Sequence, residues 1–330
     1  MPPPSVTRLA LLRALADGVW HRGSELAQRL GISRAAVSKQ AQSLALWGAP
    51  VSTRRTHGYR LDGGLDLLHA DRLKQLLHGV VPADGIELFD SIPSTNSHLM
   101  ARIAAGDRPV VCLAEHQSAG RGRRGRHWHS PYGRNLYVSV AQRYEDGPAV
   151  LAGLSLAIGA ALAQLLAGLG VAQLHLKWPN DILCASGKLG GILIELQGDT
   201  QGPCWAVAGL GLNVNMLTAE GGGIEQAWNS LARASGRTWD RTALAAQVVT
   251  TIYQVMRAFP TTGLEAWRAT YARFDGLAGQ VVQVDWAGER VDGVVCGIAD
   301  NGALLLDCAG HRRQIWGGDV SVRVGLGSAV

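Results

Sequence analysis

Cysteine is scarce in this chain, and the patterns that mark several large classes of protein are missing. The 330 residues include five cysteines, an odd number, with no Cys-x-x-Cys pair and no Cys/His cluster. Such usage fits a reduced, cytoplasmic setting and does not fit a structural zinc site. Residues 1–5 form no apolar signal region, and neither Gly-x-Ser-x-Gly nor His-Glu-x-x-His occurs. We therefore expect chemistry that needs no covalent enzyme intermediate.

Acidic residues are rare near the N-terminus. Residues 1–60 carry nine Arg or Lys against two acidic residues, although the whole chain has a net charge of only +5. The remaining residues are therefore slightly acidic in sum. A strongly basic first segment on a nearly neutral body indicates a nucleic acid as one partner.

Long apolar runs are absent except in one place. Residues 150–172 are almost unbroken in apolar and small side chains, long enough to span a bilayer. The run is rich in Ala and Gly, includes Gln164 and lacks basic or aromatic anchors at both ends. We favour a fully buried core helix over a membrane span, and expect no membrane partner.

Residues 5–62 predict a winged helix-turn-helix. Leucines from Leu9 to Leu15 recur at helical spacing, and two short helices joined by Gly-Ile-Ser follow. The expected caps and stops of the second and third helices, the latter running through Leu46, are Ser24, Gly31, Ser33 and Gly48. Residues 51–53 and 59–61 then flank a basic tip as a two-stranded wing.

The third helix separates an inward face from an outward one. Val37, Ala41 and Leu44 share the face that packs inward. A helical protein-interaction module is the alternative, but the basic charge and the wing favour DNA. The residues expected to contact DNA are Arg34, Ser38, Lys39 and Gln42 on this helix and Arg54 and Arg55 on the wing.

The rest of the chain changes character twice. A short amphipathic helix is expected over residues 65–77, followed by mixed strands and helices to residue 275. The last stretch alternates like strands separated by turns, over residues 281–286, 290–298, 303–308 and 320–324. We predict an α+β multidomain protein with a DNA-binding domain at 1–63, a mixed α/β domain at 64–275 and a small β-barrel at 276–330.

The most informative stretch is Gly120–Arg126, with four arginines and three glycines in seven residues. Glycine lets a backbone approach a ligand closely, and arginine holds phosphate or carboxylate in a planar fork. The glycines also match Gly-x-Gly-x-x-Gly, but a strand rather than a helix follows, over residues 135–141. The stretch therefore predicts an anion-binding loop rather than a dinucleotide fold; a solvated arginine loop is the plainer alternative.

A second polar constellation lies further along the chain. Lys177–Asp181 follows a strand expected over 174–176, and Lys188 precedes a strand expected over 192–196. Two lysines, a carboxylate and an amide within twelve residues would suit a nucleotide with its magnesium. Taken alone, they also fit a polar turn and a surface lysine. Residues 209–215 form a third piece, a strand whose glycines permit close approach of a ligand or close packing.

Together these motifs resemble the biotin–protein ligases. Five segments occur in the order found in that family: Ser94–Asn96, Gly120–Arg126, Lys177–Asp181, Lys188–Gly191 and Gly211–Asn213. The N-terminal domain, with Ser33–Val37 at the turn, is similar to that of the bifunctional subclass that also represses biotin synthesis genes. The resemblance extends from about residue 5 to residue 325 and implies a ligase-type central domain and an SH3-like C-terminal barrel.

The resemblance implies a two-step, ATP-dependent reaction. Biotin and ATP would give biotinyl-5′-AMP, and a lysine of the biotin carboxyl carrier protein would then accept the biotin. The residues implied to bind biotin are Ser94, Thr95, Asn96, Gln117, Arg121, Gly122, Arg123 and Lys188. Those implied for ATP or the adenylate are Lys177, Asn180, Asp181, Asn213 and Trp228, with Asp181 also on Mg²⁺. Lys188, Arg121 and Arg123 carry the catalytic expectation.

The resemblance also implies regulation. The loop carrying Trp228, after the glycines at 221–223, would order over the adenylate and promote a homodimer that binds the operator of biotin synthesis genes. Two alternatives stay open: a ligase whose DNA-binding domain no longer regulates, and a biotin-sensing transcription factor without catalysis. A lipoate–protein ligase is disfavoured by the helix-turn-helix and the Lys177–Asp181 turn. His116, His127 and His129 have no expected role beyond local hydrogen bonds.

Overall fold

The computed structural model divides into two compact units. It describes residues 6–45, 49, 51–185, 187–199, 201–217, 224–286, 289–316 and 323–324. Residues 1–139, 210–225 and 230–247 form the first unit, and residues 140–209, 226–229 and 248–330 form the second.

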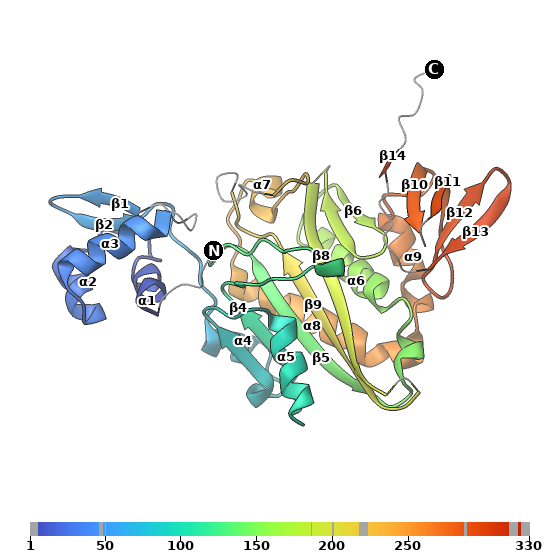
Figure 1. The fold of residues 1–330 in the computed structure, drawn as a ribbon, viewed down its shortest axis with the longest axis horizontal. Helices are drawn as coiled ribbons and strands as arrows, with labels where there is room; N and C mark the ends of the chain where they lie inside the picture. Colours follow the sequence, from blue (N-terminus) through green and yellow to red (C-terminus); the bar gives the residue numbers. More distant parts are fainter. Residues whose placement is uncertain are drawn as a thin grey trace, which may run out of the picture. The chain divides into compact units, whose positions relative to one another are not determined.

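The N-terminal region of the first unit is a winged helix-turn-helix, as predicted (Figure 1). It comprises α1 (Val6–Ala14), α2 (Gly23–Leu30), α3 (Arg34–Ala45), β1 (Val51–Arg54) and β2 (Gly58–Leu61). The two strands are antiparallel, with Val51 opposite Leu61. Leucine side chains from all three helices and from β2 are buried together in its core.

Local capping signals located two of these helix ends. Gly31 follows α2 with φ of 63°, and the Ser33 hydroxyl accepts a hydrogen bond from Ala36 N at 3.1 Å at the start of α3. The prediction that Ser24 caps α2 is wrong, because the helix already begins at Gly23. The backbone of His21 pairs with the wing, which fixes an earlier start. Leu46 and Gly48 lie outside the described residues.

The expected helix over residues 65–77 is shorter than predicted. It forms only as α4 (Ala70–Leu76). The preceding residues are held extended instead, because Leu65 N donates to Ala16 O at 2.8 Å and Leu68 N donates to the Glu115 carboxylate. Amphipathic spacing alone could not reveal these distant partners.

The central region contains a mixed seven-stranded sheet. Its strand order is β3-β4-β5-β9-β8-β7-β6. β3 and β4 are parallel, whereas β7 pairs antiparallel with both β6 and β8. The strands are β3 (Ile86–Phe89), β4 (Val111–Ala114), β5 (Leu136–Tyr144), β6 (Leu174–Lys177), β7 (Asp181–Cys184), β8 (Gly187–Gly198) and β9 (Cys204–Leu212).

The apolar run forms a buried helix in the second unit. α6 (Leu154–Gly168) contacts β6, β8 and α9 (Glu265–Phe274), and ten of its fifteen residues are buried. Residues Pro148–Gly168 are long and apolar enough to cross a membrane by composition, yet their most apolar window is 61% buried inside the protein. That packing is the one expected of a core helix.

The remaining helices are α5 (Thr95–Ala104), α7 (Leu231–Ser235) and α8 (Arg241–Thr262).

The chain ends in an antiparallel sheet, also in the second unit. Its order is β13-β12-β11-β10-β14. The strands are β10 (Val281–Trp286), β11 (Glu289–Ile298), β12 (Leu304–Cys308), β13 (His311–Ile315) and β14 (Arg323–Val324). The strand expected over 320–324 begins at Arg323 in the described part of the chain. β13 was not predicted, because its first four side chains are polar and exposed.

Candidate functional site

The first candidate group lies where α5 begins. Ser94 caps the helix by accepting from Ser97 N at 3.4 Å, which is the plain capping role. Thr95 and Asn96 have another role, because both side chains are buried at 4% exposure. One capping residue would suffice for the helix, so two further buried polar side chains indicate a built polar site.

Gln117 and Ser139 complete this polar group. Gln117 Oε1 accepts from Thr95 N at 2.9 Å and from Thr95 Oγ1 at 3.2 Å. The Ser139 hydroxyl on β5 lies 2.7 Å from Thr95 Oγ1 and 2.6 Å from Asn96 Oδ1, and is fully buried. Ser139 was missed by the sequence analysis, because a serine inside an apolar strand carries no local signal.

The arginine loop forms a small hairpin between β4 and β5. Gly122 N donates to Arg126 O at 2.7 Å, and Arg121 forms a bridge with His127. Only a single 3₁₀ turn, Arg123–Gly125, lies at the tip. No longer helix starts at these glycines in the described loop, which agrees with the rejection of a dinucleotide fold. The anion-binding role stays a prediction. Arg121 is exposed, whereas Gly122 and Arg123 are partly buried.

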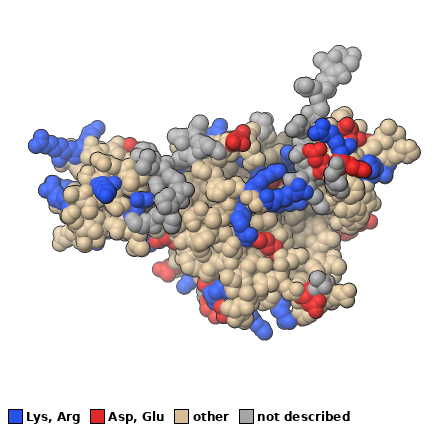
Figure 2. Space-filling view, viewed as in Figure 1, with Lys and Arg blue, Asp and Glu red and all other residues tan. Residues whose placement is uncertain are grey.

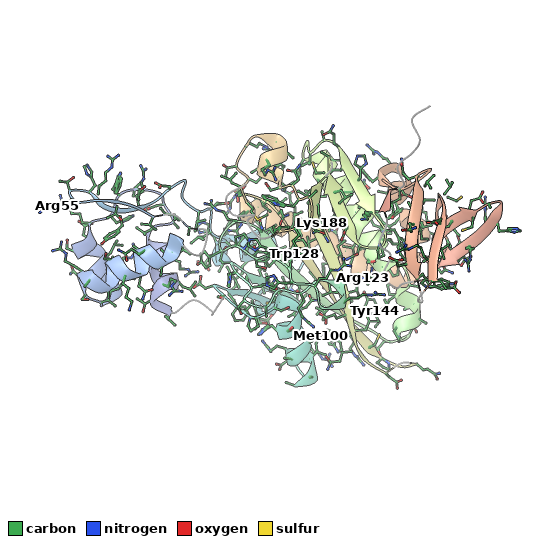
Figure 3. The ribbon with its side chains drawn as sticks, turned by 45° about the horizontal axis from the view of Figure 1, so that its top comes forward. Arg55, Met100, Arg123, Trp128, Tyr144 and Lys188 are labelled. Carbon is green, nitrogen blue, oxygen red and sulfur yellow. The ribbon has the colours of Figure 1, made fainter. Side chains whose placement is uncertain are left out.

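The indole of Trp128 closes the loop against β9. A Cβ added at Gly211 would lie 2.7 Å from Trp128 Cζ2, closer than any side chain tolerates. A Cβ at Gly120 would lie 2.8 Å from Trp128 O. Two glycines of the recognised motifs therefore make room for Trp128, which the sequence analysis did not single out. Figure 3 labels Trp128 and Arg123.

His116, one of the histidines beside the loop, makes a local contact. His116 Nδ1 lies 2.8 Å from Ser91 Oγ. Burial, with His129 nearby, lowers the pKa of His116 to about 4, so its ring is uncharged at neutral pH. His116 therefore adds no positive charge to the arginine loop.

Asn213, the last residue of its motif, is held by a second asparagine. Asn135 Nδ2 donates to Asn213 Oδ1 at 3.2 Å, and Asn135 Oδ1 accepts from Val214 N at 3.0 Å. Both asparagines are buried. The amide of Asn213 is thereby fixed next to the end of β9 in the first unit.

The second candidate group lies in the second unit, at the turn from β6 to β7. Lys177 pairs with Asp181 across the turn, which contains a cis Trp178–Pro179 bond. Asn180 Nδ2 donates to Ile192 O at 2.7 Å, so its amide anchors the turn to β8. Lys177, Asn180 and Asp181 are all partly buried, so each keeps some exposure to solvent.

Lys188 lies within β8 rather than before it, which corrects the expected start of that strand at residue 192. Its Nζ is 2.8 Å from Asp181 Oδ1, and both side chains are about four-fifths buried. A register shift where β7 pairs with β8 accompanies this position. Two of the three charged members of the predicted nucleotide group, Lys188 and Asp181, are therefore direct partners.

The segment carrying Trp228 lies against Lys188. Lys188 N donates to Ala227 O, and Asn229 N donates to Lys188 O, each at 2.9 Å. A Cβ at Gly187 would lie 2.7 Å from Trp228 O, so glycine is needed for this approach. The glycines at 221–223 lie outside the described residues.

The N-terminal domain presents its basic residues outward. Val37, Ala41 and Leu44 are buried at 3% exposure or less, as predicted. Figure 2 shows Lys and Arg gathered at the end of the wing, where Figure 3 labels Arg55. Of the residues expected to contact DNA, Ser38 is partly buried, and those exposed are Arg34, Lys39, Gln42, Arg54 and Arg55.

Trp20 packs against the wing, with contacts that reach its tip. The Arg54 guanidinium lies 5.2 Å from the centroid of its ring and that of Arg60 lies 4.9 Å away. The ring of His57 packs against it at 5.7 Å. Both arginines are within cation–π range, so Trp20 orients two of the wing's positive charges.

Comparison with known proteins identifies the family. A model of the biotin/lipoate A/B protein ligase family matches residues 88–213. Models of a helix-turn-helix domain and of the biotin protein ligase C-terminal domain match residues 7–60 and 279–323. The bifunctional ligase/repressor BirA of Salmonella typhimurium is 39% identical over 315 residues, which cover 96% of this chain and 97% of that protein. The chain belongs to the BirA family of bifunctional biotin ligase/repressors.

Other relatives agree with membership of the BirA family. BirA of Escherichia coli is 38% identical over 96% of this chain and 97% of its own length. The biotin–[acetyl-CoA-carboxylase] ligase of Mycobacterium tuberculosis is 36% identical over 69% of this chain and 85% of its own. The structure of a biotin protein ligase from Aquifex aeolicus in complex with biotin and ATP, 24% identical, aligns with a TM-score of 0.61 over 72% of this chain and 98% of that one, which supports the fold.

Proposed function

We propose that the first-unit group of Ser94, Thr95, Asn96, Gln117 and the arginine loop binds biotin for ligation to a carrier protein. The observation that carries this proposal is the buried hydrogen-bonded set of Thr95, Gln117 and Ser139. A ureido ring needs donors and acceptors in fixed places, and buried polar side chains provide them only when their own partners hold them still.

The proposed reaction has two steps. An oxygen of the biotin carboxylate attacks the α-phosphorus of ATP, the bond to the bridging oxygen of the β-phosphate breaks, and pyrophosphate leaves. A neutral lysine amine of the biotin carboxyl carrier protein then attacks the acyl carbon of biotinyl-5′-AMP, AMP leaves and the amine loses a proton. Carboxylate and triphosphate repel one another, so cations must neutralise both.

The arginine loop is proposed to bind the acyl-phosphate. Arg121 and Arg123 supply positive charge, and Gly122 between them lets the backbone approach the ligand. The hydrogen bond between Gly122 N and Arg126 O holds the loop as a hairpin, so less conformational entropy is lost when a ligand binds. Catalysis would then come mainly from positioning and charge stabilisation.

The second-unit group is proposed to hold the nucleotide. Lys188 and Lys177 would neutralise phosphate oxygens, and Asn180 and Trp228 would complete the adenylate contacts of this group. Asn213, in the first unit, is proposed as a further adenylate contact. Magnesium would arrive as the Mg·ATP substrate, since Mg²⁺ is usually held by one or two carboxylates together with phosphates. Asp181 fits that pattern: it supplies one carboxylate, and no cluster of three acidic, His or Cys ligands exists among the described residues.

The N-terminal domain is proposed to repress biotin synthesis genes in the cytoplasm. A twofold operator implies a dimer, and the adenylate would promote that dimer by ordering the Trp228 segment. Arg34, Ser38, Lys39 and Gln42 would enter the groove, and Arg54 and Arg55 would contact phosphates.

Transfer of biotin to a carrier-domain fragment, with ATP and magnesium, tests the ligase proposal. The full-length chain is expected to label the fragment, and omission of ATP or biotin is expected to abolish labelling. Tight biotin binding without transfer would turn the interpretation toward a sensor. Absence of biotin binding would contradict the assignment of the first-unit group.

Replacing Trp20 by alanine is expected to weaken binding to a random-sequence duplex about fivefold, because two wing arginines lose their support. Trp20→Phe keeps a ring and is the matched control. Arg55→Ala, in contrast, should reduce the slope of log affinity against log salt by about one unit, as expected for one lost phosphate contact. Fluorescence anisotropy over a salt series measures both. Equal binding by Trp20→Ala and wild type would show that the ring does not orient the arginines.

A further inference from the structure

A fully buried ion pair lies where the segment that carries the arginine loop begins. Arg241, the first residue of α8, has 0% of its side chain exposed, and Glu115, directly after β4, has 1%. Arg241 Nη2 is 2.7 Å from Glu115 Oε2. Neither residue belongs to the proposed contacts with biotin or ATP, and burying such a pair is expensive unless every group is satisfied.

The Arg241 guanidinium contacts the residues at both ends of segment 116–134, which contains the arginine loop. Glu115 immediately precedes residues 116–134, and Asn135 immediately follows them. Arg241 Nη2 also donates to Asn135 O at 2.7 Å, and Nε donates to the same carbonyl at 3.2 Å. Gly133 N donates to Glu115 O at 3.0 Å, which closes the base of the loop a second time.

We infer that Arg241 is a positioning residue for biotin binding, because its guanidinium clamps the two ends of the loop that carries Gln117 and the arginines. This inference rests on the proposed function of that loop. Arginine suits the task because its planar fork aims several N–H groups at fixed angles, which an ammonium cannot do. An apolar filling could give equal stability but would not define the distance between the loop ends.

The same clamp reaches two other segments. Arg241 Nη1 donates to Asp66 O, and Leu68 N donates to the second oxygen of Glu115. Asn135, whose carbonyl Arg241 holds, is the residue whose amide holds Asn213. Loss of the Arg241 contacts should therefore disturb residues 116–134 and Asn213 together. It should leave the second-unit group of Lys188 and Asp181 intact.

Arg241→Lys and Glu115→Gln test the inference. Arg241→Lys keeps the charge but cannot serve both loop ends, and Glu115→Gln keeps the shape but removes the charge. Each is expected to raise the KM for biotin at least about tenfold, because residues 116–134 carry proposed biotin contacts. The KM for ATP should change less, because Asn213 is the one proposed ATP contact that the clamp reaches. Trypsin should also cut the loop at Arg121–Arg126 at least about fivefold faster, well below the unfolding temperature.

Two controls separate positioning from stability. Phe259→Leu lies in the same helix, is buried at 1% exposure and should lower the unfolding temperature without changing either readout. Arg72→Met breaks the partly exposed pair with Asp240, next to Arg241, and should change nothing. Loop cleavage and biotin KM within twofold of wild type in both test variants would overturn the inference. Because trypsin needs no turnover, faster cleavage of both variants of a chain whose wild type transfers no biotin would support the clamp while contradicting the ligase proposal.

Discussion

Replacing Lys188 by alanine is expected to slow formation of biotinyl-5′-AMP by about 10²–10³-fold, the usual loss when one preorganised donor to a developing charge is removed. Lys188 is held by the protein itself: β8 fixes its backbone, and the Asp181 carboxylate lies 2.8 Å from its Nζ. A cation fixed in this way needs little reorganisation when negative charge develops on the α-phosphate. The rate should therefore fall more than the affinity for either substrate.

Pyrophosphate exchange measures this rate directly. Lys188→Arg should retain part of the activity, since it keeps the charge but changes its geometry. Lys74→Ala, an exposed lysine in the last turn of α4, is the matched control and should behave as wild type. Exchange within about threefold of wild type in Lys188→Ala would falsify the role of Lys188, since electrostatic stabilisation of this kind is worth far more.

The sequence predicted the elements whose causes are local. Gly31 and Ser33 end one helix and begin the next by their own conformational and hydrogen-bonding properties, and both predictions are confirmed. The helix expected from residue 65 failed for the opposite reason. Its first turn is held extended by Ala16 and by the side chain of Glu115, both distant in sequence. Pattern and propensity describe the helical preference of the segment itself, not a distant hydrogen-bond partner that overrides this preference.

The residues of the candidate site also differ in whether the sequence alone could identify them. Thr95 and Lys188 came from motifs and Gln117 from the family resemblance, and all three keep their assigned roles as proposals. Ser139 and Trp128 could not be found this way, because each matters through a contact made by folding: Ser139 with Thr95, and Trp128 with Gly211. A serine or tryptophan near a motif has no distinguishing pattern until its neighbour across the sheet is known.

Replacing Gly211 by alanine is the second change with a large expected effect. The added methyl would lie 2.7 Å from Trp128 Cζ2, inside the van der Waals contact distance. Either β9 or the Trp128 end of the arginine loop must move, and overpacking of this kind costs about 1–3 kcal/mol of unfolding free energy. Because the loop carries the proposed biotin contacts, we expect biotin affinity to fall about a hundredfold, as a displacement near 1 Å can cause. Isothermal titration with biotin and thermal unfolding measure the two effects.

Gly159→Ala provides the matched comparison, because the same methyl at α6 would meet Leu176 and Ile192 at 3.5 and 3.6 Å, an ordinary contact. There, alanine should stabilise the helix by about 0.5–1 kcal/mol and leave biotin binding unchanged. A double-mutant cycle with Trp128→Ala isolates the cause. If the clash is with the indole, Gly211→Ala should cost little further stability once the ring is gone, and the coupling energy should exceed about 1 kcal/mol. Additive losses would instead mean that Gly211 is needed for the backbone of β9 itself.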